Sequence, residues 1–394
     1  MKIGILTFHS QLNYGGVLQC WALQTALERM GHEVVVIDRW HNPDNSLLEC
    51  GYNKFGLKQW IKLLIRLLLG LGDFSQWQRI KRTKKFLKAK LNLTPYHFVD
   101  WNDAPKDLSV DLLVVGSDQV WHCGDWGDPR PYLLDGAPKI PAIAYATSLG
   151  MKSLPERLGE KDGLSEIDTE TFYRTSLKKF KAISCREREG VDICSSLAFQ
   201  ATHVVDPTLL AYDGETKCIG KSNRLVCYFM DEPIVESLVA LETFAKKMDC
   251  SVEIFSDRGN LRPIPKTPRM LASRYSEIIH RIGSRVKIRS SAGPKEFYDS
   301  FKSATYVISD SFHALMFSIL NNCNARIIRP SNAMRSKMFS RITEFADHTT
   351  GSLISNSLQE AIASISAGER VVYDSEWLQT RVEFSKNWLE ANIK

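Results

Sequence analysis

The sequence predicts an α/β protein built from two Rossmann-like domains that face each other across a cleft. At 394 residues the chain is longer than a single hydrophobic core usually supports. Apolar strand segments alternate with helical patterns in both halves, which indicates mostly parallel sheets covered on both faces. A polar, turn-rich segment at 206–223 interrupts this alternation. Ligands of such sheets bind beyond the carboxyl ends of the strands, so a site is expected there.

The first half, residues 1–210, is expected to form an N-terminal domain. Its first strand is followed by the helical pattern GVLQCWALQTALERM, and further strands alternate with helices. The predicted strands are KIGILTF (2–8), EVVVID (33–38), DLLVVGS (111–117), IPAIAYATS (140–148), KAISC (181–185) and HVVD (203–206). Their continuous apolar character is typical of strands buried inside a parallel sheet.

A second alternation over residues 222–372 predicts a C-terminal domain. Its expected strands are RLVCYFM (224–230), SVEIFS (251–256), TYVIS (305–309) and NARIIRP (324–330), with helical patterns between them. In the last segment, 373–394, the sequence SEWLQTRVEFSKNWLEANI has helical apolar spacing. It is long enough to pack back toward the N-terminal domain.

An insert at about 54–92 in the first domain combines an apolar helix pattern with many basic residues. Its first part, LKQWIKLLIRLLLGL (57–71), carries a narrow basic stripe, and QRIKRTKKFLKAK (78–90) contains no acidic residue. This pattern suits the face of an anionic membrane, and it suits equally a helix packed on the domain beside a solvated basic segment. No apolar run reaches the length needed to span a bilayer.

Composition and charge limit the classes of protein to consider. An apolar fraction of 44% and a charged fraction of 24% describe an ordinary globular protein. The start MKIGILTFHS lacks a signal peptide's apolar core, so the protein is expected in the cytoplasm, with peripheral contact at the inner face of the cell membrane as a further expectation. The nine cysteines form no CxxC pair, and no metal site is expected. The net charge of +6 is too dispersed to indicate a nucleic-acid partner.

The most informative stretch is TYVISDSFHALMFSIL (305–320), in which a strand runs into small polar residues and then a helix. His313 falls in the first turn of that helix. Free backbone N–H groups and the positive end of the helix dipole favour an anion at this place, and a titratable imidazole sits beside them. The alternative is an N-capped helix whose histidine is merely exposed.

Two loops of the first domain carry groups suited to a polar ligand. In FHSQLNYGGVLQ, residues His9 and Asn13 precede a glycine pair, Gly15 and Gly16, that would let the backbone approach a ligand closely. The loop does not match GxGxxG, so it is a weak dinucleotide signal. In VVGSDQVWH the polar and aromatic groups of a second set suit sugar hydroxyls, or else form an Asx turn with a buried tryptophan. That second set comprises Ser117, Asp118, Gln119 and Trp121.

Arginines past two predicted strands add positive charge near the cleft. Arg186 and Arg188 follow the strand KAISC, where a guanidinium can take a carboxylate or phosphate in bidentate fashion. An interdomain salt bridge would explain them almost as well. In the second domain the arginines that follow His313 are Arg326, Arg329, Arg335 and Arg341.

Together these segments resemble the polysaccharide pyruvyl transferase family. The matching stretches appear in the family's order over roughly residues 1–345. They are FHSQLNYGGVLQCWALQ, VVGSDQVWH, AYATSLG, ISCREREGV, VDPTLL, VISDSFHALMFSIL and the later SRI (340–342). The resemblance implies a GT-B-like arrangement of the two domains, with the acceptor on the N-terminal side and the donor on the C-terminal side. It also implies transfer of the enolpyruvyl group of phosphoenolpyruvate onto two hydroxyls of one sugar, which forms a cyclic ketal and releases phosphate.

The resemblance also implies roles for the candidate residues. His313 would be the general acid, because ketal formation needs a proton on the methylene carbon of phosphoenolpyruvate. The donor would be held by Arg186, Ser311, Phe312 and Arg341, and the acceptor by His9, Asn13, Gly15, Gly16, Ser117, Asp118, Gln119 and Trp121. Some members have an arginine where this chain has Ser311, so donor binding is expected to rely on backbone N–H groups or on Arg341. Phosphoenolpyruvate is a co-substrate, and no other cofactor is implied.

The implied acceptor is a repeat unit of a capsular polysaccharide or exopolysaccharide, often carried on a membrane diphospholipid. Two other interpretations stay open from the sequence. One is a GT-B glycosyltransferase that uses a nucleotide sugar, for which Asp310 or Glu296 would have to bind the ribose. The other is a non-catalytic partner of a polysaccharide assembly complex.

Overall fold

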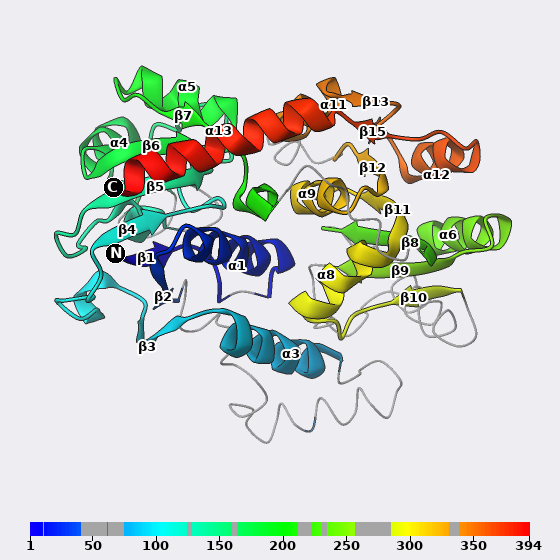
Figure 1. The fold of residues 1–394 in the computed structure, drawn as a ribbon, viewed down its shortest axis with the longest axis horizontal. Coiled ribbons are helices and arrows are strands. Elements are labelled where there is room, and N and C mark those ends of the chain that lie inside the picture. Colours follow the sequence, from blue (N-terminus) through cyan, green and yellow to red (C-terminus); the bar gives the residue numbers. More distant parts are fainter. Residues whose placement is uncertain are drawn as a thin grey trace.

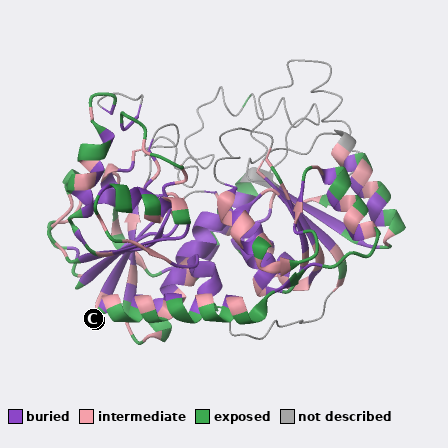
Figure 2. Ribbon diagram, turned by 90° about the horizontal axis from the view of Figure 1, so that it is seen from above, coloured by how far each residue is buried: buried purple, intermediate pink, exposed green. Residues whose placement is uncertain are grey.

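The computed structural model confirms an α/β protein with two parallel sheets, each flanked by helices (Figure 1). The structure describes residues 1–10, 12–40, 61, 75–123, 128–159, 164–211, 222–230, 235–256, 285–330 and 339–394. Buried residues concentrate in the two sheets and in the helices between them (Figure 2). The two sheets correspond to the two Rossmann-like domains expected from the alternation of apolar strands and helices.

The first sheet has seven strands in the order β3-β2-β1-β4-β5-β6-β7, and every strand pair in it is parallel. The strands are β1 (Lys2–Leu6), β2 (Glu33–Arg39), β3 (Leu93–Phe98), β4 (Leu112–Val115), β5 (Ala142–Thr147), β6 (Phe180–Cys185) and β7 (Thr202–His203). Strands β4 and β5 are buried along their whole length, as their unbroken apolar sequences predict. Strand order changes direction at β1 and β4, which is the position where doubly wound sheets bind ligands.

Helices connect these strands and begin at recognisable caps. They are α1 (Tyr14–Arg29), α3 (Ser75–Lys90), α4 (Thr169–Leu177) and α5 (Arg188–Ser196), with short 3-10 turns η2 (Trp101–Asp103), η3 (Arg130–Leu133) and η4 (Pro207–Ala211). Asn13 begins α1 because its side chain accepts a hydrogen bond from the Gly16 amide at 3.1 Å. Asp168 begins α4 in the same way.

The second sheet has six strands in the order β10-β9-β8-β11-β12-β14. They are β8 (Ser222–Phe229), β9 (Ser251–Ser256), β10 (Val286–Ile288), β11 (Ala304–Ser309), β12 (Asn324–Ile328) and β14 (Ile354–Ser355). The associated helices are α6 (Val235–Lys247), α8 (Pro294–Ser303), α9 (Phe312–Leu320), α11 (Ser340–Asp347) and α12 (Leu358–Ser366). Strands β13 (Thr349–Thr350) and β15 (Val372–Tyr373) form a small antiparallel pair.

The last helix, α13 (Ser375–Ile393), runs from the second domain along the first (Figure 1). It begins where Asp374 accepts a hydrogen bond from the Trp377 amide at 3.0 Å. Near its middle, the buried Ser385 hydroxyl accepts a hydrogen bond from the Val205 amide at 3.0 Å. The Trp388 ring lies against Tyr145 of β5 at a centroid distance of 6.0 Å. The helix therefore ties the end of the chain to the first sheet.

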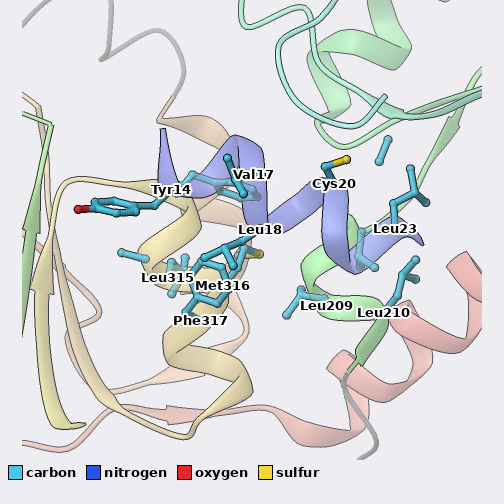
Figure 3. Packing of buried hydrophobic residues seen from close by; sticks show 14 of the residues in the cluster. Tyr14, Val17, Leu18, Cys20, Leu23, Leu209, Leu210, Leu315, Met316 and Phe317 are labelled. Carbon is cyan, nitrogen blue, oxygen red and sulfur yellow. The ribbon is translucent and has the colours of Figure 1, made fainter. Parts of the chain in front are cut away.

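The largest hydrophobic cluster contains buried side chains from both domains. Side chains of α1, α9 and η4 gather in it (Figure 3). Tyr14, at the start of α1, donates a hydrogen bond to the Ala292 carbonyl at 2.9 Å and stacks on Phe297 at 4.4 Å. The domain boundary was expected within 206–223, yet the first residues of that segment form η4, and Leu209 is fully buried. This short apolar stretch at the start of the otherwise polar segment lies between α1, α9 and α13.

The basic part of the predicted insert forms α3, which packs on one face only. Arg79, Phe86 and Leu87 are buried, whereas the lysines Lys81, Lys84, Lys85 and Lys88 are exposed. This matches the interpretation of a solvated basic helix beside the domain. The apolar segment 57–71 lies outside the described residues, apart from Ile61. Within the described part of the chain, every helix is too short or too polar to cross a bilayer.

Candidate active site

His313 lies at the start of α9, where the second sheet meets α1 of the first domain. Its imidazole packs on the α-carbon of Gly15. A Cβ atom at residue 15 would lie 2.6 Å from Cγ and 2.7 Å from Cε1 of the ring, so only glycine fits. The histidine is 9% exposed, in contrast to the alternative of a freely exposed side chain. The glycine pair thus lets the backbone approach His313, a use that the sequence did not predict.

The Nε2 edge of the imidazole points toward Asp206. Nε2 of His313 lies 3.9 Å from Oδ2 of Asp206, and this buried nitrogen has no hydrogen-bond partner among the described residues. Asp206 is fixed, because its Oδ1 accepts hydrogen bonds from the amide and hydroxyl of Thr208 at 3.0 and 2.8 Å. Sequence reasoning missed Asp206 as a site residue. It is the last residue of the strand segment HVVD (203–206), so the rule applied to Asp118 would have found it.

Arg186 binds two carboxylates of its own domain. Its Nη1 donates to Oδ2 of Asp206 at 2.8 Å, and its Nη2 donates to Oδ1 of Asp118 at 3.1 Å. The side chain is 1% exposed, and its Nε lies 3.7 Å from Glu187. Each terminal nitrogen thus already serves a carboxylate of the protein, and the expected bidentate grip on a donor stays a prediction. The interdomain salt bridge belongs to Arg188, which lies 3.4 Å from Glu344 of α11.

Arg341 carries an unpaired charge beside this network. Its Nε and Nη1 are shielded from solvent and have no hydrogen-bond partner among the described residues. Burial, and then the charge of Arg186, lower the pKa of Arg341 to about 10. The guanidinium carbons of Arg341 and Arg186 lie 4.8 and 5.2 Å from the ring centre of Phe312. The Phe312 ring thus contacts Arg186, which is ion-paired with carboxylates, and Arg341, which has no hydrogen-bond partner for Nε and Nη1 among the described residues.

The electrostatics of the site depend on burial and on this charge network. Burial raises the pKa of Asp206 and of Asp118, but Arg186 and His313 more than offset it and hold both pKa values below 3.8. Burial lowers the pKa of His313 below 6.5, even though Asp206 and Asp118 favour its charged form. When His313 is neutral, the carboxylates of Asp118, Asp206 and Glu187 outnumber the guanidiniums of Arg186 and Arg341, so this group of residues carries one net negative charge. An anion that enters beside Arg341 is therefore expected to favour proton uptake.

Three of the residues expected to bind the acceptor are buried and contact other groups of the protein. The Ser117 hydroxyl is fully buried and donates to Oδ2 of Asp206 at 3.2 Å and to the Ala146 carbonyl. His9 is 1% exposed and lies 2.9 Å from Oδ1 of Asp38. Trp121 is fully buried, and its Nε1 donates to the Tyr132 carbonyl at 3.1 Å. In this structure all three side chains are enclosed by the protein, which differs from the exposed position expected of acceptor-binding groups.

The other expected acceptor residues line up differently. Asn13 caps α1, and its amide oxygen is used by Gly16. Gly16 lies close to Asp118, because a Cβ there would be 3.3 Å from Oδ2 of that carboxylate. Gln119 is half-buried and approaches Gly150. Of the four candidate residues in VVGSDQVWH, Gln119 is the least buried, and Asp118 is buried beside Arg186.

Of the three other candidate arginines after His313 in the sequence, two are engaged away from the site. Arg326 is fully buried and donates to Ser364, Asn324 and two backbone carbonyls, so it holds β12 to the end of α12. Arg329 lies over the Phe339 ring at 4.8 Å. Arg335 lies outside the described residues. Among the residues that the structure describes, no three His, Cys, Asp or Glu side chains gather as a metal site.

Comparison with known proteins decides the family. The model of the family described as polysaccharide pyruvyl transferase matches residues 13–332. The chain belongs to this family. It is therefore an enzyme of the polysaccharide pyruvyl transferase kind, as its resemblance implied. The match contains all the groups around His313 except Arg341.

Solved structures share the fold at low sequence identity. A protein of Listeria monocytogenes assigned as a UDP-N-acetylglucosamine 2-epimerase aligns with a TM-score of 0.54 and 11% identity, over 100% of this chain and 95% of that one. The UDP-N-acetylglucosamine 2-epimerase of Rickettsia bellii aligns with a TM-score of 0.46 and 10% identity, over 100% and 95%. The first likeness confirms a GT-B-like arrangement of the two domains. A comparison with curated proteins finds no sequence match.

Proposed function

We propose that the protein is a ketal pyruvyltransferase that moves the enolpyruvyl group of phosphoenolpyruvate onto two hydroxyls of one sugar, with His313 as general acid. The observation that carries this proposal is that Nε2 of His313 and the Nε and Nη1 of Arg341 all lack a hydrogen-bond partner among the described residues. These atoms are shielded from solvent, and both side chains lie beside Phe312. A proton donor next to an unmatched cation suits an anionic substrate that must be protonated.

The reaction proceeds by protonation of the methylene carbon of phosphoenolpyruvate. His313 gives this proton, which leaves a cation-like centre on the adjacent carbon, and one sugar hydroxyl adds there with loss of its own proton. The carbon–oxygen bond to phosphate then breaks, inorganic phosphate leaves, and the second hydroxyl closes the ring. A bound donor anion raises the pKa of His313, so the proton is held when the donor is present.

Donor binding rests mainly on Arg341 in this proposal. The Ser311 amide donates to the hydroxyl of Ser309 at 3.1 Å, so it is committed inside the protein. Both terminal nitrogens of Arg186 already donate to Asp206 and Asp118, and its Nε has no hydrogen-bond partner among the described residues. In this proposal Arg341 binds a carboxylate or phosphate oxygen of the donor, and the Phe312 ring positions its guanidinium. Arg186 lowers the pKa values of Asp118 and Asp206, which keeps both carboxylates beside His313 charged.

Asp206 acts as a positioning residue for His313. Its carboxylate stabilises the imidazolium that forms when the donor binds, and its own orientation is fixed by Arg186 and Thr208. Asp118 contributes in the same sense, and Asp118 and Gln119 face the acceptor side. The acceptor is a capsular or exopolysaccharide repeat unit carried on a diphospholipid, which brings the protein to the inner face of the membrane.

The use of a nucleotide sugar is the second candidate function, and the carboxylates it requires are already engaged. Asp310 accepts a hydrogen bond from the Met230 amide at 2.8 Å. Glu296 accepts one from the Gly293 amide at 3.0 Å and lies 3.5 Å from Arg82. Neither is placed to receive a ribose without giving up these partners. The observations therefore favour phosphoenolpyruvate as donor.

A phosphate-release assay with phosphoenolpyruvate and candidate galactosides tests the function. Wild type releases phosphate only with acceptor present, and His313→Ala lowers the rate by at least about 100-fold, the loss typical of a general acid. His348→Ala is the matched control, because His348 stacks on Trp377 at 4.1 Å and lies outside the site. Full activity of His313→Ala would remove the histidine from the mechanism. Turnover of a nucleotide sugar without any phosphate release from phosphoenolpyruvate would favour the second candidate.

A further inference from the structure

A basic pocket lies where α3 of the first domain meets the end of β10 in the second. It has a volume of about 290 Å³ and is lined by Arg82, Lys287, Ile288, Arg289 and Ser291. Arg82 comes from α3, whereas the other residues belong to β10 or follow it directly. The pocket therefore exists only when the two domains are packed together. None of these residues belongs to the cluster around His313.

The cations of the pocket are held in place but poorly neutralised. Nη1 of Arg82 donates to the carbonyl and hydroxyl oxygens of Ser291 at 2.8 and 3.2 Å. Two carboxylates lie at ion-pair distance from these cations: Glu296 is 3.5 Å from the Arg82 guanidinium, and Glu253 is 3.6 Å from the Arg289 guanidinium. Glu253 is also shared with a further cation, Arg224, at 3.6 Å. Because Glu253 is shared between Arg224 and Arg289, the cations around the pocket outnumber the carboxylates paired with them.

Lys287 adds a charge that has no ion-pair partner among the described residues, and it is exposed. Two guanidiniums and one ammonium thus converge on a small space. Guanidinium groups match phosphate oxygens in geometry and charge, and an ammonium adds a point charge. A volume of about 290 Å³ corresponds to roughly ten water molecules. That space suits one phosphate or diphosphate group.

We propose that this pocket binds a phosphate or diphosphate group of the acceptor. The assignment to the acceptor rests on the proposed function, whereas the anion site itself rests on the pocket alone. The exposed lysines of α3 extend the positive potential away from Arg82, which suits a carrier that lies at an anionic surface. The ligand chemistry is therefore that of a sugar joined to a lipid through a diphosphate.

The position of the pocket in the sheet separates it from the donor site. His313 follows β11, and β10 is three strands away in the order β10-β9-β8-β11. Three strand spacings are roughly 14 Å, so a molecule as small as phosphoenolpyruvate cannot reach both places. An acceptor can, because its reacting sugar and its diphosphate are separated by other sugar units. The two anion sites therefore hold different substrates.

Titration calorimetry with inorganic pyrophosphate tests the site without any turnover. Lys287→Ala combined with Arg289→Ala is expected to weaken pyrophosphate binding by about tenfold or more, because two charged contacts are lost. Lys246→Ala, an exposed lysine of α6 in the same domain, is the control and leaves binding unchanged. Arg341→Ala is expected to leave the pyrophosphate affinity of this pocket unchanged, because the substitution alters only the donor site. Equal pyrophosphate affinity in wild type and the double variant would overturn the proposal.

Kinetics then distinguish the source of the phosphate. The double variant is expected to raise the KM for a diphosphate-linked acceptor by about tenfold, with the KM for phosphoenolpyruvate and for the same sugar without diphosphate unchanged. A raised KM for phosphoenolpyruvate would overturn the separate site. Loss of binding to phosphatidylglycerol vesicles, with acceptor KM unchanged, would assign the pocket to lipid headgroups and overturn the acceptor role. If no acceptor supports phosphate release but pyrophosphate binding still depends on Lys287 and Arg289, the proposed function fails and the anion site stands.

Discussion

Gly15 and Gly16 stand next to each other in the first turn of α1, yet they face different neighbours. The α-carbon of Gly15 contacts the imidazole of His313, and there is no room for a side chain. At Gly16 a Cβ would lie 3.3 Å from a carboxylate oxygen of Asp118, a contact that a small shift can relieve. The pair therefore offers a matched test of how exactly the imidazole must be placed.

Gly15→Ala is expected to lower kcat by about 100-fold, because the new methyl group displaces the imidazole by roughly an ångström. It is also expected to lower the free energy of unfolding by about 1–3 kcal/mol, the usual effect of overpacking. Phosphate release and thermal unfolding measure the two effects. Gly16→Ala, with the same change in helix propensity, should show a much smaller loss of kcat. A Gly15→Ala enzyme with wild-type kcat would mean that the position of the ring is not critical.

The pKa of His313 predicts a pH dependence that differs between two kinetic constants. A general acid must be protonated, so activity falls as the pH rises through its pKa. In the free enzyme burial holds this pKa below 6.5, and kcat/KM for the donor is expected to decline from that range upward. The bound anion raises the pKa, so kcat should decline at a higher pH. Rate profiles from pH 5 to 9 check this, and identical midpoints for kcat and kcat/KM would contradict it.

The element that joins the domains is the first turn of α1. Tyr14 enters the aromatic cluster of the second domain, where it stacks on Phe297 and meets Phe255 and Tyr228 edge-on. Arg79 of α3 covers the other side of the ring at 4.3 Å. The helix start therefore anchors one domain in the core of the other.

Tyr14→Ala is expected to lower the free energy of unfolding by about 3–5 kcal/mol, the usual cost of removing a large buried aromatic ring. Tyr14→Phe keeps the stacking and loses the hydrogen bond to the Ala292 carbonyl, which should cost about 1 kcal/mol. Urea unfolding followed by tryptophan fluorescence measures both. Similar losses for the two variants would show that the hydroxyl, and not the ring, is the main contribution.

Amphipathic pattern alone could not separate the alternatives for the basic insert. The lysines of α3 lie on its exposed face, as a solvated helix requires, but two of its arginines reach acceptors in other segments of the chain. Arg79 donates to the Leu12 carbonyl at 2.6 Å, and Arg82 reaches Ser291 of the other domain. A run of lysines and arginines does not reveal which members find buried acceptors, because those acceptors come from distant segments.

At the scale of the whole molecule, apolar alternation was sufficient to predict two parallel sheets and the edge at which the site lies. It also placed His313, Arg186, Asp118 and the glycine pair at strand ends that meet. It did not predict their pairing. Whether Arg186 binds a ligand or two carboxylates depends on Asp206, which arrives from another strand end. The burial of Ser117 and Trp121 likewise depends on packing between strands that no local pattern records.

Tyr14 and Gly15 are neighbours in the chain, and they contact the aromatic cluster and the His313 imidazole of the same partner domain. This adjacency has a consequence for exchanging halves between relatives. A chimaera that joins the N-terminal half of one enzyme to the C-terminal half of another must match the cavity for residue 14 and the histidine beside residue 15 together. Grafts are therefore expected to succeed when the segment around Tyr14 is carried over with the second domain, and to lose folding and activity at once when it is not.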